Sequence, residues 1–463
     1  MPFTDQLRSE TSALYTDLYQ LTMLQAYWRE GMDETAVFDL FVRRLTDRNY
    51  LLACGLEQAL EYLEHLSFSD EALDYLDEQD QFDPSFLEWL SDFAFTGNVY
   101  AVPEGTPVFP DEPIVEVVAP IGEAQLAETF LLNQITFQTL AASKASRVVQ
   151  AAHQGGTDRL VADFGMRRMH GTDAALKAAR AFYIAGVDAT SNVAAGKAYG
   201  LPITGTMAHS YIEAHDAEMD AFREFSDLYP ETILLVDTYD TLDGVRKVIA
   251  MAEENGEDFR IRGIRLDSGN LAELAKQSRR LLDDAGLEDV MIFASSGLDE
   301  HKIARLLDQG APIDGFGVGT KMGTSADQPA LDSVYKLCGY AGQPRMKLSA
   351  QKSNLPGRKQ IIRQYEDGTA RRDVIVTEDE NGHPGAPLLD RVMTDGERTE
   401  VGAARPLDAV REHAAARVSE LPDRLHTLGH SEESYDVVLS DEMEARLNDT
   451  RADLHEAMRE ELS

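Results

Sequence analysis

Short apolar runs alternate with longer amphipathic segments from residue 159 to residue 318. The apolar runs predict strands over residues 159–164, 186–189, 202–207, 232–236, 260–266, 290–294 and 313–318. The intervening segments have helical spacing and predict helices over residues 172–184, 243–254, 271–285 and 299–309. A strand followed by a helix every ~20–30 residues is typical of a parallel sheet with crossover helices. Six or seven such units favour a closed or nearly closed α/β barrel, and a doubly wound sheet is the alternative.

The chain before residue 150 has a different pattern, in which strands and helices do not alternate regularly. The predicted elements are a helix over residues 11–27, a strand over 37–42, acidic helices within 55–95, β-hairpins over 98–119 and an apolar helix over 124–149. At the other end of the chain, residues 412–420 and 441–461 predict acidic helices. These segments predict an α+β part beside the barrel and a helical C-terminal extension.

Composition narrows the class of protein. A chain of 463 residues is long enough for two or three domains. It has no run of 18 apolar residues, and its first ten residues lack a secretory pattern, so we expect no membrane association. Its two cysteines, Cys54 and Cys338, are too few for a disulfide framework or a multi-cysteine zinc site. We therefore expect a cytoplasmic protein.

The formal net charge of −38 comes from acidic residues spread along the whole chain. The 43 basic residues include only 11 lysines, of which the first is Lys144. A dispersed acidic surface with few lysines indicates a protein from a salt-loving organism, since salt screens the repulsion between its charges. An ordinary acidic cytosolic enzyme is the alternative. In either case we expect no nucleic-acid partner, because the overall field repels phosphate backbones.

Basic residues nevertheless follow several of the predicted strands. Because the carboxyl ends of parallel strands share one edge of a sheet, these side chains should meet at one rim: Arg167, Arg168, Arg265 and Lys321. Small-residue loops that open onto helices, such as residues 295–297 and 317–320, suit phosphate. Helix capping is the alternative explanation for the Ser, Thr and Asp residues there, but it does not explain the cations. The pattern predicts an anionic ligand.

His209 follows the predicted strand over residues 202–207. The strand would fix the base of the side chain while the ring faces the rim, and histidine is the side chain that titrates near neutrality. We expect His209 to be the most reactive group of this rim. A hydrogen-bonded structural histidine is the alternative.

The motifs TDLYQLTMLQAYW, FDLFVRR, DFGMRR, ATSNVAAG, TGTMAHS, RLDSGN, SSGLDE, GVGTKM and KLSAQKSNLPGRKQ together resemble those of nicotinate phosphoribosyltransferase, from about residue 16 to residue 363. This resemblance implies the type II phosphoribosyltransferase fold, an incomplete α/β barrel with a mixed α+β domain. We expect residues 1–122 and 331–400 to form the α+β domain, residues 123–330 the barrel and residues 401–463 an acidic helical extension. The resemblance also implies a homodimer with active sites at the subunit interface.

The family's reaction joins nicotinate to phosphoribosyl pyrophosphate (PRPP), giving nicotinate mononucleotide and pyrophosphate for NAD synthesis, coupled to ATP hydrolysis with Mg²⁺. The resemblance assigns phosphorylation by ATP to His209, a role near the ribose hydroxyls to Asp267, and ligand contacts to Arg167 and Arg265. It further implies a pyridine ring between Phe164 and Tyr19 of the partner subunit. The ribose 5-phosphate would lie on Ser295, Ser296, Gly297, Gly317, Gly319 and Thr320. Lys144 and Arg147, three residues apart on one helix face, would face pyrophosphate.

Ser191 bears on the choice of substrate. Relatives that use nicotinamide carry an acidic residue at the aligned position, which would accept hydrogen bonds from an amide and repel a carboxylate. A serine hydroxyl can instead donate to a carboxylate, which favours nicotinate. The alternatives are a nicotinamide phosphoribosyltransferase, a catalytically silent PRPP-binding regulator on the same fold, and a scaffold whose acidic helices bind a basic partner. A binding protein has no need of His209, Arg265 and Asp267 together.

Overall fold

The computed structural model describes residues 12–348 and 354–460. The described chain forms two compact units. One unit combines the chain up to Ser143 with the chain from Ala330 onward, and the other is Lys144–Pro329. The first division falls inside a single long helix, α7 (Glu128–Ala152). The motif over residues 347–360 lies partly outside the described residues.

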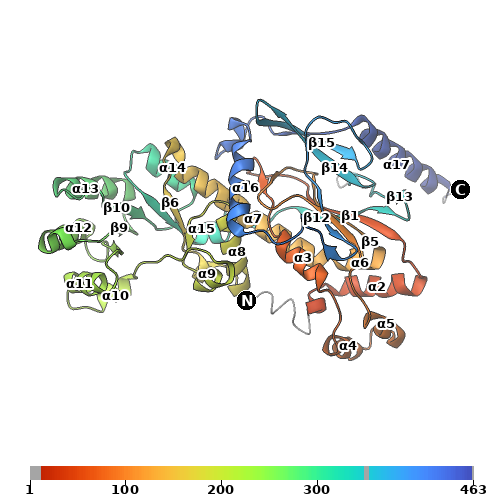
Figure 1. Cartoon of the computed structure of the whole chain (residues 1–463), viewed down its shortest axis with the longest axis horizontal. Coiled ribbons are helices and arrows are strands. Elements are labelled where there is room, and N and C mark those ends of the chain that lie inside the picture. The colour runs from red at the N-terminus through yellow and green to blue at the C-terminus, as the bar shows by residue number, and fades with distance from the viewer. Residues whose placement is uncertain (1–11, 349–353, 461–463) are drawn as a thin grey trace. The chain divides into compact units, whose positions relative to one another are not determined.

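The unit Lys144–Pro329, yellow to green in Figure 1, is built on a six-stranded sheet in the order β7-β6-β11-β10-β9-β8. All of its strand pairs are parallel. The strands are β6 (Leu160–Asp163), β7 (Ala189–Thr190), β8 (Ile233–Leu235), β9 (Gly263–Leu266), β10 (Met291–Ala294) and β11 (Gly315–Val318). The sheet curls but stays open between its edge strands β7 and β8, so the predicted incomplete barrel is confirmed.

The predicted strand over residues 202–207 is wrong. Only Ile203 makes a β-bridge, to Thr190 of β7, and residues 204–208 are irregular. Pro202 has no backbone N–H to give to a ladder, and Gly205 weakens a strand. The sheet therefore ends at β7 on this side.

The helices of this unit follow the predicted crossover pattern. They are α8 (Thr172–Ile184), α9 (Val193–Tyr199), α10 (His209–Glu213), α11 (Glu218–Leu228), α12 (Thr241–Asn255), α13 (Leu271–Asp284), α14 (Glu300–Asp308) and α15 (Thr320–Gly323), with single 3₁₀ turns η2 (Gln154–Gly156), η3 (Met166–Arg168) and η4 (Gly256–Asp258). A side chain caps the N-terminus of four of them: Asn192, Asp240, Asn270 and Asp299. Capping thus explains part of the polar character of the strand ends.

The other unit has a seven-stranded sheet in the order β13-β12-β1-β5-β3-β17-β18. Its strands are β1 (Thr35–Val42), β3 (Asn98–Ala101), β5 (Pro113–Pro120), β12 (Ser333–Tyr340), β13 (Gln343–Pro344), β17 (Asp390–Thr394) and β18 (Glu397–Arg398). Strand β1 pairs antiparallel with β12 and β5, so segments far apart in sequence complete one sheet. Its residues after Thr35 are all buried, as expected for a nearly continuous apolar strand at the centre of a sheet.

Two smaller sheets and several helices complete this unit. A four-stranded sheet has the order β16-β14-β15-β19, and β2 pairs with β4. These strands are β2 (Leu51–Leu52), β4 (Pro107–Val108), β14 (Lys359–Glu366), β15 (Thr369–Thr377), β16 (Ala386–Pro387) and β19 (Asp436–Leu439). The helices are η1 (Ser12–Leu14), α2 (Leu18–Glu30), α3 (Leu56–Glu64), α4 (Asp70–Asp77), α5 (Pro84–Leu90), α6 (Ile121–Leu126), the first part of α7, α16 (Leu407–Ser419), η5 (Asp423–His426) and α17 (Asp441–Glu460).

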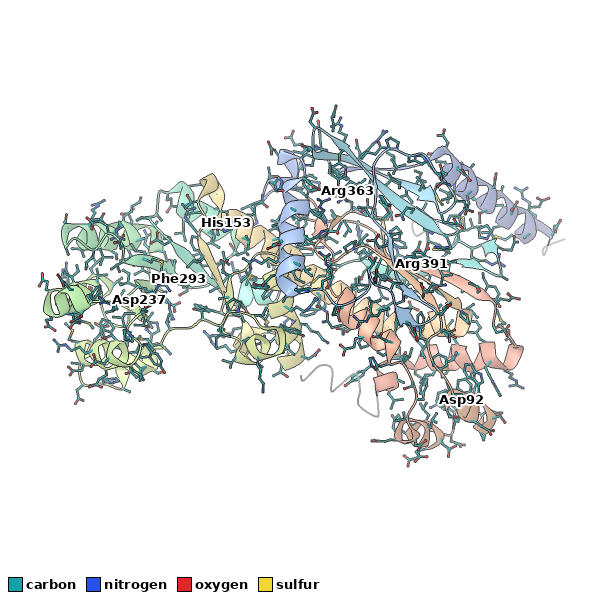
Figure 2. The ribbon with its side chains drawn as sticks, in the orientation of Figure 1. Asp92, His153, Asp237, Phe293, Arg363 and Arg391 are labelled. Carbon is teal, nitrogen blue, oxygen red and sulfur yellow. The ribbon has the colours of Figure 1, made fainter. Side chains whose placement is uncertain are left out.

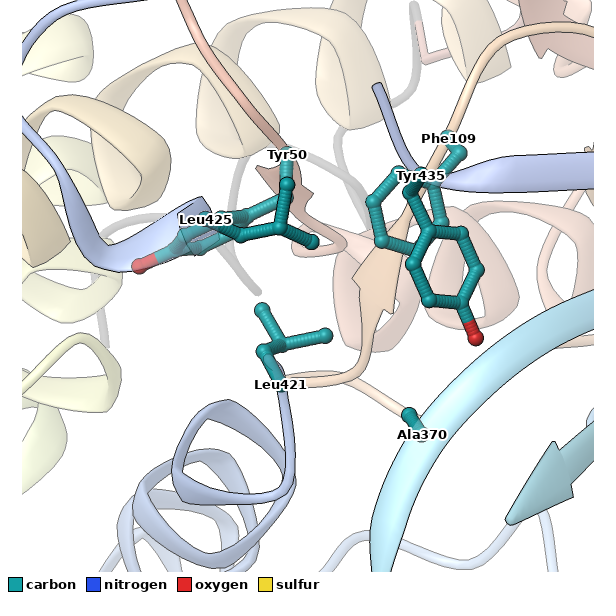
Figure 3. Close-up of a cluster of buried hydrophobic side chains, with 6 residues drawn as sticks. All are labelled: Tyr50, Phe109, Ala370, Leu421, Leu425 and Tyr435. Carbon is teal, nitrogen blue, oxygen red and sulfur yellow. The ribbon is translucent and has the colours of Figure 1, made fainter. Parts of the chain in front are cut away.

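The C-terminal segment contains the two predicted helices, α16 and α17, but it also enters the core of this unit. Strand β19 pairs in parallel with β15. The side-chain amide of Asn49 donates to the carbonyl oxygens of Leu425, Thr427 and Gly429. A buried apolar cluster joins residues from both ends of the chain (Figure 3): Tyr50, Phe109, Ala370, Leu421, Leu425 and Tyr435. The segment is therefore part of the domain rather than an appendage.

In the part of the chain that the structure describes, none of the helices has the length and apolar character needed to cross a membrane.

Candidate functional site

The candidate site lies at the carboxyl ends of the parallel strands in the unit Lys144–Pro329. Among the side chains labelled in Figure 2, Asp237 follows β8 and Phe293 lies within β10. Because all strands of the sheet are parallel, the loops after β6, β8, β9, β10 and β11 leave the sheet at one edge. The structure thus confirms the shared edge on which the sequence-based prediction depended.

His209 begins the short helix α10 instead of following a strand. Its Nδ1 lies 3.1 Å from Thr238 Oγ1, and its Nε2 lies 3.7 Å from Asp267 Oδ2. The side chains of His209 and Asp267 are each about one-third exposed. The imidazole is therefore oriented on one side by a hydroxyl, faces a carboxylate on the other, and remains open to a ligand.

Asp267 is held in place by the neighbouring loop. The carboxylate of Asp237 accepts hydrogen bonds from the backbone N–H of Asp267 at 2.8 Å and from the hydroxyl of Ser268 at 2.6 Å, both at Oδ2. The hydroxyl of Ser295 donates to Asp267 Oδ1. The second oxygen of Asp237, Oδ1, is buried and has no partner among the described residues. A second carboxylate therefore adjoins Asp267, with one buried oxygen unused.

Arg265 is anchored by one nitrogen. Its Nη1 donates to the hydroxyl of Thr206 and to the carbonyl oxygen of Met207, the latter at 3.2 Å. Its buried Nε has no hydrogen-bond partner within the described chain. Burial lowers the pKa of Arg265, while Asp267 and Asp237 raise it, and the net shift is downward. A partly desolvated guanidinium with a free donor is suited to an anionic ligand.

Phe164 presents a half-buried ring at the end of β6. Its N–H donates to the carbonyl oxygen of Val318 at 2.8 Å, and its ring centre lies 6.0 Å from that of Phe293. A Cβ on Gly317 would come within 2.5 Å of the Phe164 ring. Glycine at 317 is thus explained by the closeness of this ring, in addition to any contact with phosphate.

The two small-residue loops have distinct conformations. Ser296 and Gly297 both have positive φ, of 91° and 57°, and Ser296 is strained in this region because it has a Cβ. Asp299 then caps α14, accepting the backbone N–H of Lys302 at 2.7 Å. In the other loop, Gly319 and Thr320 lead into the single-turn helix α15. Both loops follow neighbouring strands, as a phosphate-binding edge requires.

Ser191 borders a cavity of about 900 Å³. Its backbone N–H donates to the carbonyl oxygen of Asp163 at 2.8 Å. The cavity wall combines polar and apolar side chains, including Ser191, Thr204, Thr206, Val193, Ile203 and Leu228. Thr206 belongs both to this wall and to the contacts of Arg265. The cavity therefore adjoins the group formed by Arg265, Asp267 and His209.

Other predicted site residues have different surroundings. Lys144 and Arg147 lie on one face of α7, but both are buried and form ion pairs with Glu300. Arg167 is exposed on η3 and close enough to Arg265 to lower its pKa. Tyr19 lies on α2 in the other unit and is 48% exposed. Burial and then Glu128 raise the pKa of its hydroxyl to about 12.

Sequence reasoning assigned no role to Asp237, Thr238 or Thr206. The first two stand in the run DTYD directly after a predicted strand, which was the available signal. Each acts on another side chain of the site, and such indirect contacts cannot be read from the spacing of residues.

The chain matches two family models. The nicotinate phosphoribosyltransferase N-terminal domain matches residues 14–136, and the nicotinate phosphoribosyltransferase family matches residues 160–361. A nicotinate phosphoribosyltransferase of Mycobacterium tuberculosis is 51% identical over 453 residues, which cover 97% of this chain and 96% of that protein. The Bacillus subtilis enzyme of the same name is 46% identical over 365 residues, covering 77% of this chain and 74% of that protein.

The crystal structure of human nicotinic acid phosphoribosyltransferase superposes with a TM-score of 0.82 at 29% identity. The alignment covers 94% of this chain and 99% of the human chain. The fold, the order of the motifs and these similarities agree: the chain belongs to the nicotinate phosphoribosyltransferase family.

Proposed function

We propose that this protein is a nicotinate phosphoribosyltransferase of NAD synthesis, which joins nicotinate to PRPP and couples the reaction to ATP hydrolysis through phosphorylation of His209. The observation that carries the proposal is the imidazole of His209 between Thr238 and Asp267, beside the partly unpaired Arg265. This group lies at one edge of the sheet with the two small-residue loops. The family relationship supports the transferase activity, and the site geometry supports the residue roles.

Each part of the reaction has a matching feature. Arg265 offers a donor for the carboxylate of nicotinate or for a phosphate, and the ring of Phe164 offers a stacking surface. The nicotinate nitrogen attacks the anomeric carbon of PRPP, and the bond from that carbon to pyrophosphate breaks. The carboxylate of Asp267 would stabilise the positive charge that develops on the ribose.

The coupling step needs a nucleophile and a carboxylate nearby. A neutral imidazole nitrogen of His209 attacks the γ-phosphorus of ATP, an N–P bond forms, and ADP leaves. The hydroxyl of Thr238 holds the ring in one orientation during this attack. Hydrolysis of the phosphohistidine would return the site to its starting state.

Two carboxylates fit the Mg²⁺ that such phosphoryl chemistry uses. The described residues contain no group of three or more His, Cys, Asp or Glu that could hold a metal. However, Mg²⁺ is commonly bound by one or two carboxylates together with substrate phosphates. The unused buried oxygen of Asp237 and the carboxylate of Asp267 form such a pair. When bound there, Mg²⁺ would neutralise phosphate charge.

The test is product formation by the purified protein with nicotinate, PRPP, Mg²⁺ and ATP. We expect nicotinate mononucleotide to form, and His209→Ala to lose ATP-coupled turnover while still binding nicotinate mononucleotide. His215→Ala is the matched control, because the ring of His215 bonds the backbone carbonyl oxygen of Tyr211. An unchanged ATPase cycle in His209→Ala would refute the role of His209.

The proposal includes a cytoplasmic homodimer in which Tyr19 of one copy completes the ring-binding surface of the other. Its exposed position on α2 supports such a contact. In the same assay, mixing the separately inactive Tyr19→Ala and His209→Ala proteins should restore part of the activity, because a mixed dimer has one intact site. A mixture that stays inactive, although subunits exchange, would contradict the shared site.

A further inference from the structure

We propose that Lys144 and Arg147 are positioning residues that brace the two phosphate-binding loops, and that they do not bind pyrophosphate. The inference rests on the proposed role of those loops in holding ribose 5-phosphate. It is carried by buried ion pairs that lie outside the site itself. It also replaces the sequence-based expectation for these two residues.

The carboxylate of Glu300 forms ion pairs with both cations. Lys144 Nζ lies 2.8 Å from Glu300 Oε1 and 2.6 Å from Oε2, and Arg147 Nε lies 3.0 Å from Oε1. The side chains are 2%, 7% and 0% exposed for Lys144, Arg147 and Glu300. Burial raises the pKa of Glu300, but Lys144 and Arg147 lower it by more, so the net shift is downward. The carboxyl therefore stays ionised. A buried and paired cation has no open side for a diphosphate.

Glu300 is the first residue of α14, and Asp299 alone separates it from the loop over residues 295–298. The loop is fixed at this end by the pairs with α7 and by Asp299, which caps the helix. Lys302, in the first turn, donates through Nζ to the carbonyl oxygen of Ser296 at 2.6 Å. The strained φ of Ser296 needs such support, because an unbraced loop would relax toward commoner backbone angles.

Lys144 also reaches the second loop. Its Nζ lies 2.6 Å from Asp327 Oδ1, in the segment that follows α15. Lys321 of α15 pairs with Asp299 Oδ2 at 2.5 Å. One ammonium group therefore contacts carboxylates beyond the ends of both loops, and a second ion pair joins the loops to each other.

Each of the three cations Lys144, Arg147 and Lys321 faces a carboxylate, and these carboxylates belong to Glu300, Asp327 and Asp299. An incoming pyrophosphate would have to break buried pairs, which costs more than an exposed contact returns. The cluster is suited to fixing the loops before a ligand arrives, which lowers the ordering cost of binding.

The test measures binding of two probes, ribose 5-phosphate and inorganic pyrophosphate, by titration calorimetry on the full-length protein. We expect Lys144→Met to weaken ribose 5-phosphate binding by about tenfold or more, since the two loops lose the ammonium group that they share. Glu300→Gln alone keeps both cations but removes the carboxylate that they share, and should weaken this binding to a similar extent. Pyrophosphate binding should change by less than about threefold in both proteins.

Two further variants separate the possible outcomes. Lys177→Met removes another buried ammonium, paired with Asp173 at 2.6 Å, and should lower Tm without changing ribose 5-phosphate binding. Gly297→Val alters the loop itself and should abolish that binding. If Gly297→Val has no effect, the loop assignment fails and the proposal with it. If only pyrophosphate binding falls in Lys144→Met, or Glu300→Gln leaves ribose 5-phosphate binding unchanged, the bracing role is overturned.

Discussion

At the residue scale, His209 depends on two neighbours that come from different loops. Thr238 fixes the ring through Nδ1, and Asp267 faces Nε2. The sequence grouped His209, Asp267 and Arg265 because each was assigned to the end of a predicted parallel strand, and Asp267 does follow β9. Thr238 could not be predicted, since its contact with His209 depends on the local path of α10. The strand predicted before His209 is absent, yet the side chain still reaches the edge.

Lys144 and Arg147 show the opposite case. Their spacing correctly placed both on one helix face, within an otherwise uncharged stretch. The partner carboxylate, Glu300, is more than 150 residues away in sequence, and its burial is not visible from helical spacing. Sequence therefore located the cations but not their contacts.

A residue-scale prediction concerns Ser191. Ser191→Asp should weaken use of nicotinate relative to nicotinamide by about tenfold, because the new carboxylate repels the substrate carboxylate and accepts from an amide. The check is the ratio of kcat/KM for the two substrates. Ser191→Ala is the control, which removes the hydroxyl without adding charge. An unchanged ratio in Ser191→Asp would discredit the substrate argument.

At the scale of elements, strands were predicted correctly where a run of β-branched or aromatic residues has backbone N–H and C=O groups available for pairing with a neighbouring strand. Strands β6, β8, β9, β10 and β11 all fall within the predicted ranges. The run over residues 202–207 failed because Pro202 and Gly205 interrupt the ladder that its apolar residues suggested. The predicted helices of this unit were supported by their periodicity, and α8 covers the whole range expected.

Helix α16 offers an element-scale prediction. Nε2 of its His413 lies 3.1 Å from Thr106 Oγ1, and burial, with Arg405 and Arg417, lowers the pKa of His413 to about 4. The folded state thus favours the neutral ring, so this contribution to stability is present above about pH 6.5 and is lost as pH falls toward 4. After a discount for partial exposure, we expect about 1 kcal/mol to be lost between about pH 7 and pH 5.

The measurement is the free energy of unfolding at pH 7 and pH 5, for the natural protein and for His413→Gln. The variant should lose less stability over this interval, because glutamine does not titrate. His455→Gln, on the exposed part of α17, should behave like the natural protein. Equal pH dependence in all three proteins would contradict the role of His413.

At the scale of the whole molecule, the net charge of −38 stands out. With 43 basic residues, ion pairs such as that between Arg363 and Asp373, at 2.6 Å, cannot neutralise all 81 acidic residues. The remaining negative charge repels itself in the folded state and is screened by salt, over about 10 Å at 0.1 M and about 3 Å at 1 M. Composition alone predicts this property, because it depends on the charge count and not on the fold.

We therefore expect Tm to rise by about 10 °C between 0.1 M and 2 M KCl. Calorimetry or circular dichroism at constant pH would measure the change. Tetramethylammonium chloride is the control, since it screens charge without specific binding of K⁺. A Tm that falls or stays constant with KCl would argue against adaptation to salt.

The seven-stranded sheet, whose strands come from both ends of the chain, has a consequence for folding during protein synthesis. Strand β1 emerges from the ribosome early and ends at Val42, but its neighbour β12 begins only at Ser333. At a synthesis rate of ~5–20 residues per second, β1 is made tens of seconds before β12. All strands of the unit Lys144–Pro329 have been synthesised before β12. Nascent chains should therefore complete the parallel sheet first, and a chaperone that shields apolar strands would meet β1 and β5 before the strands of the parallel sheet.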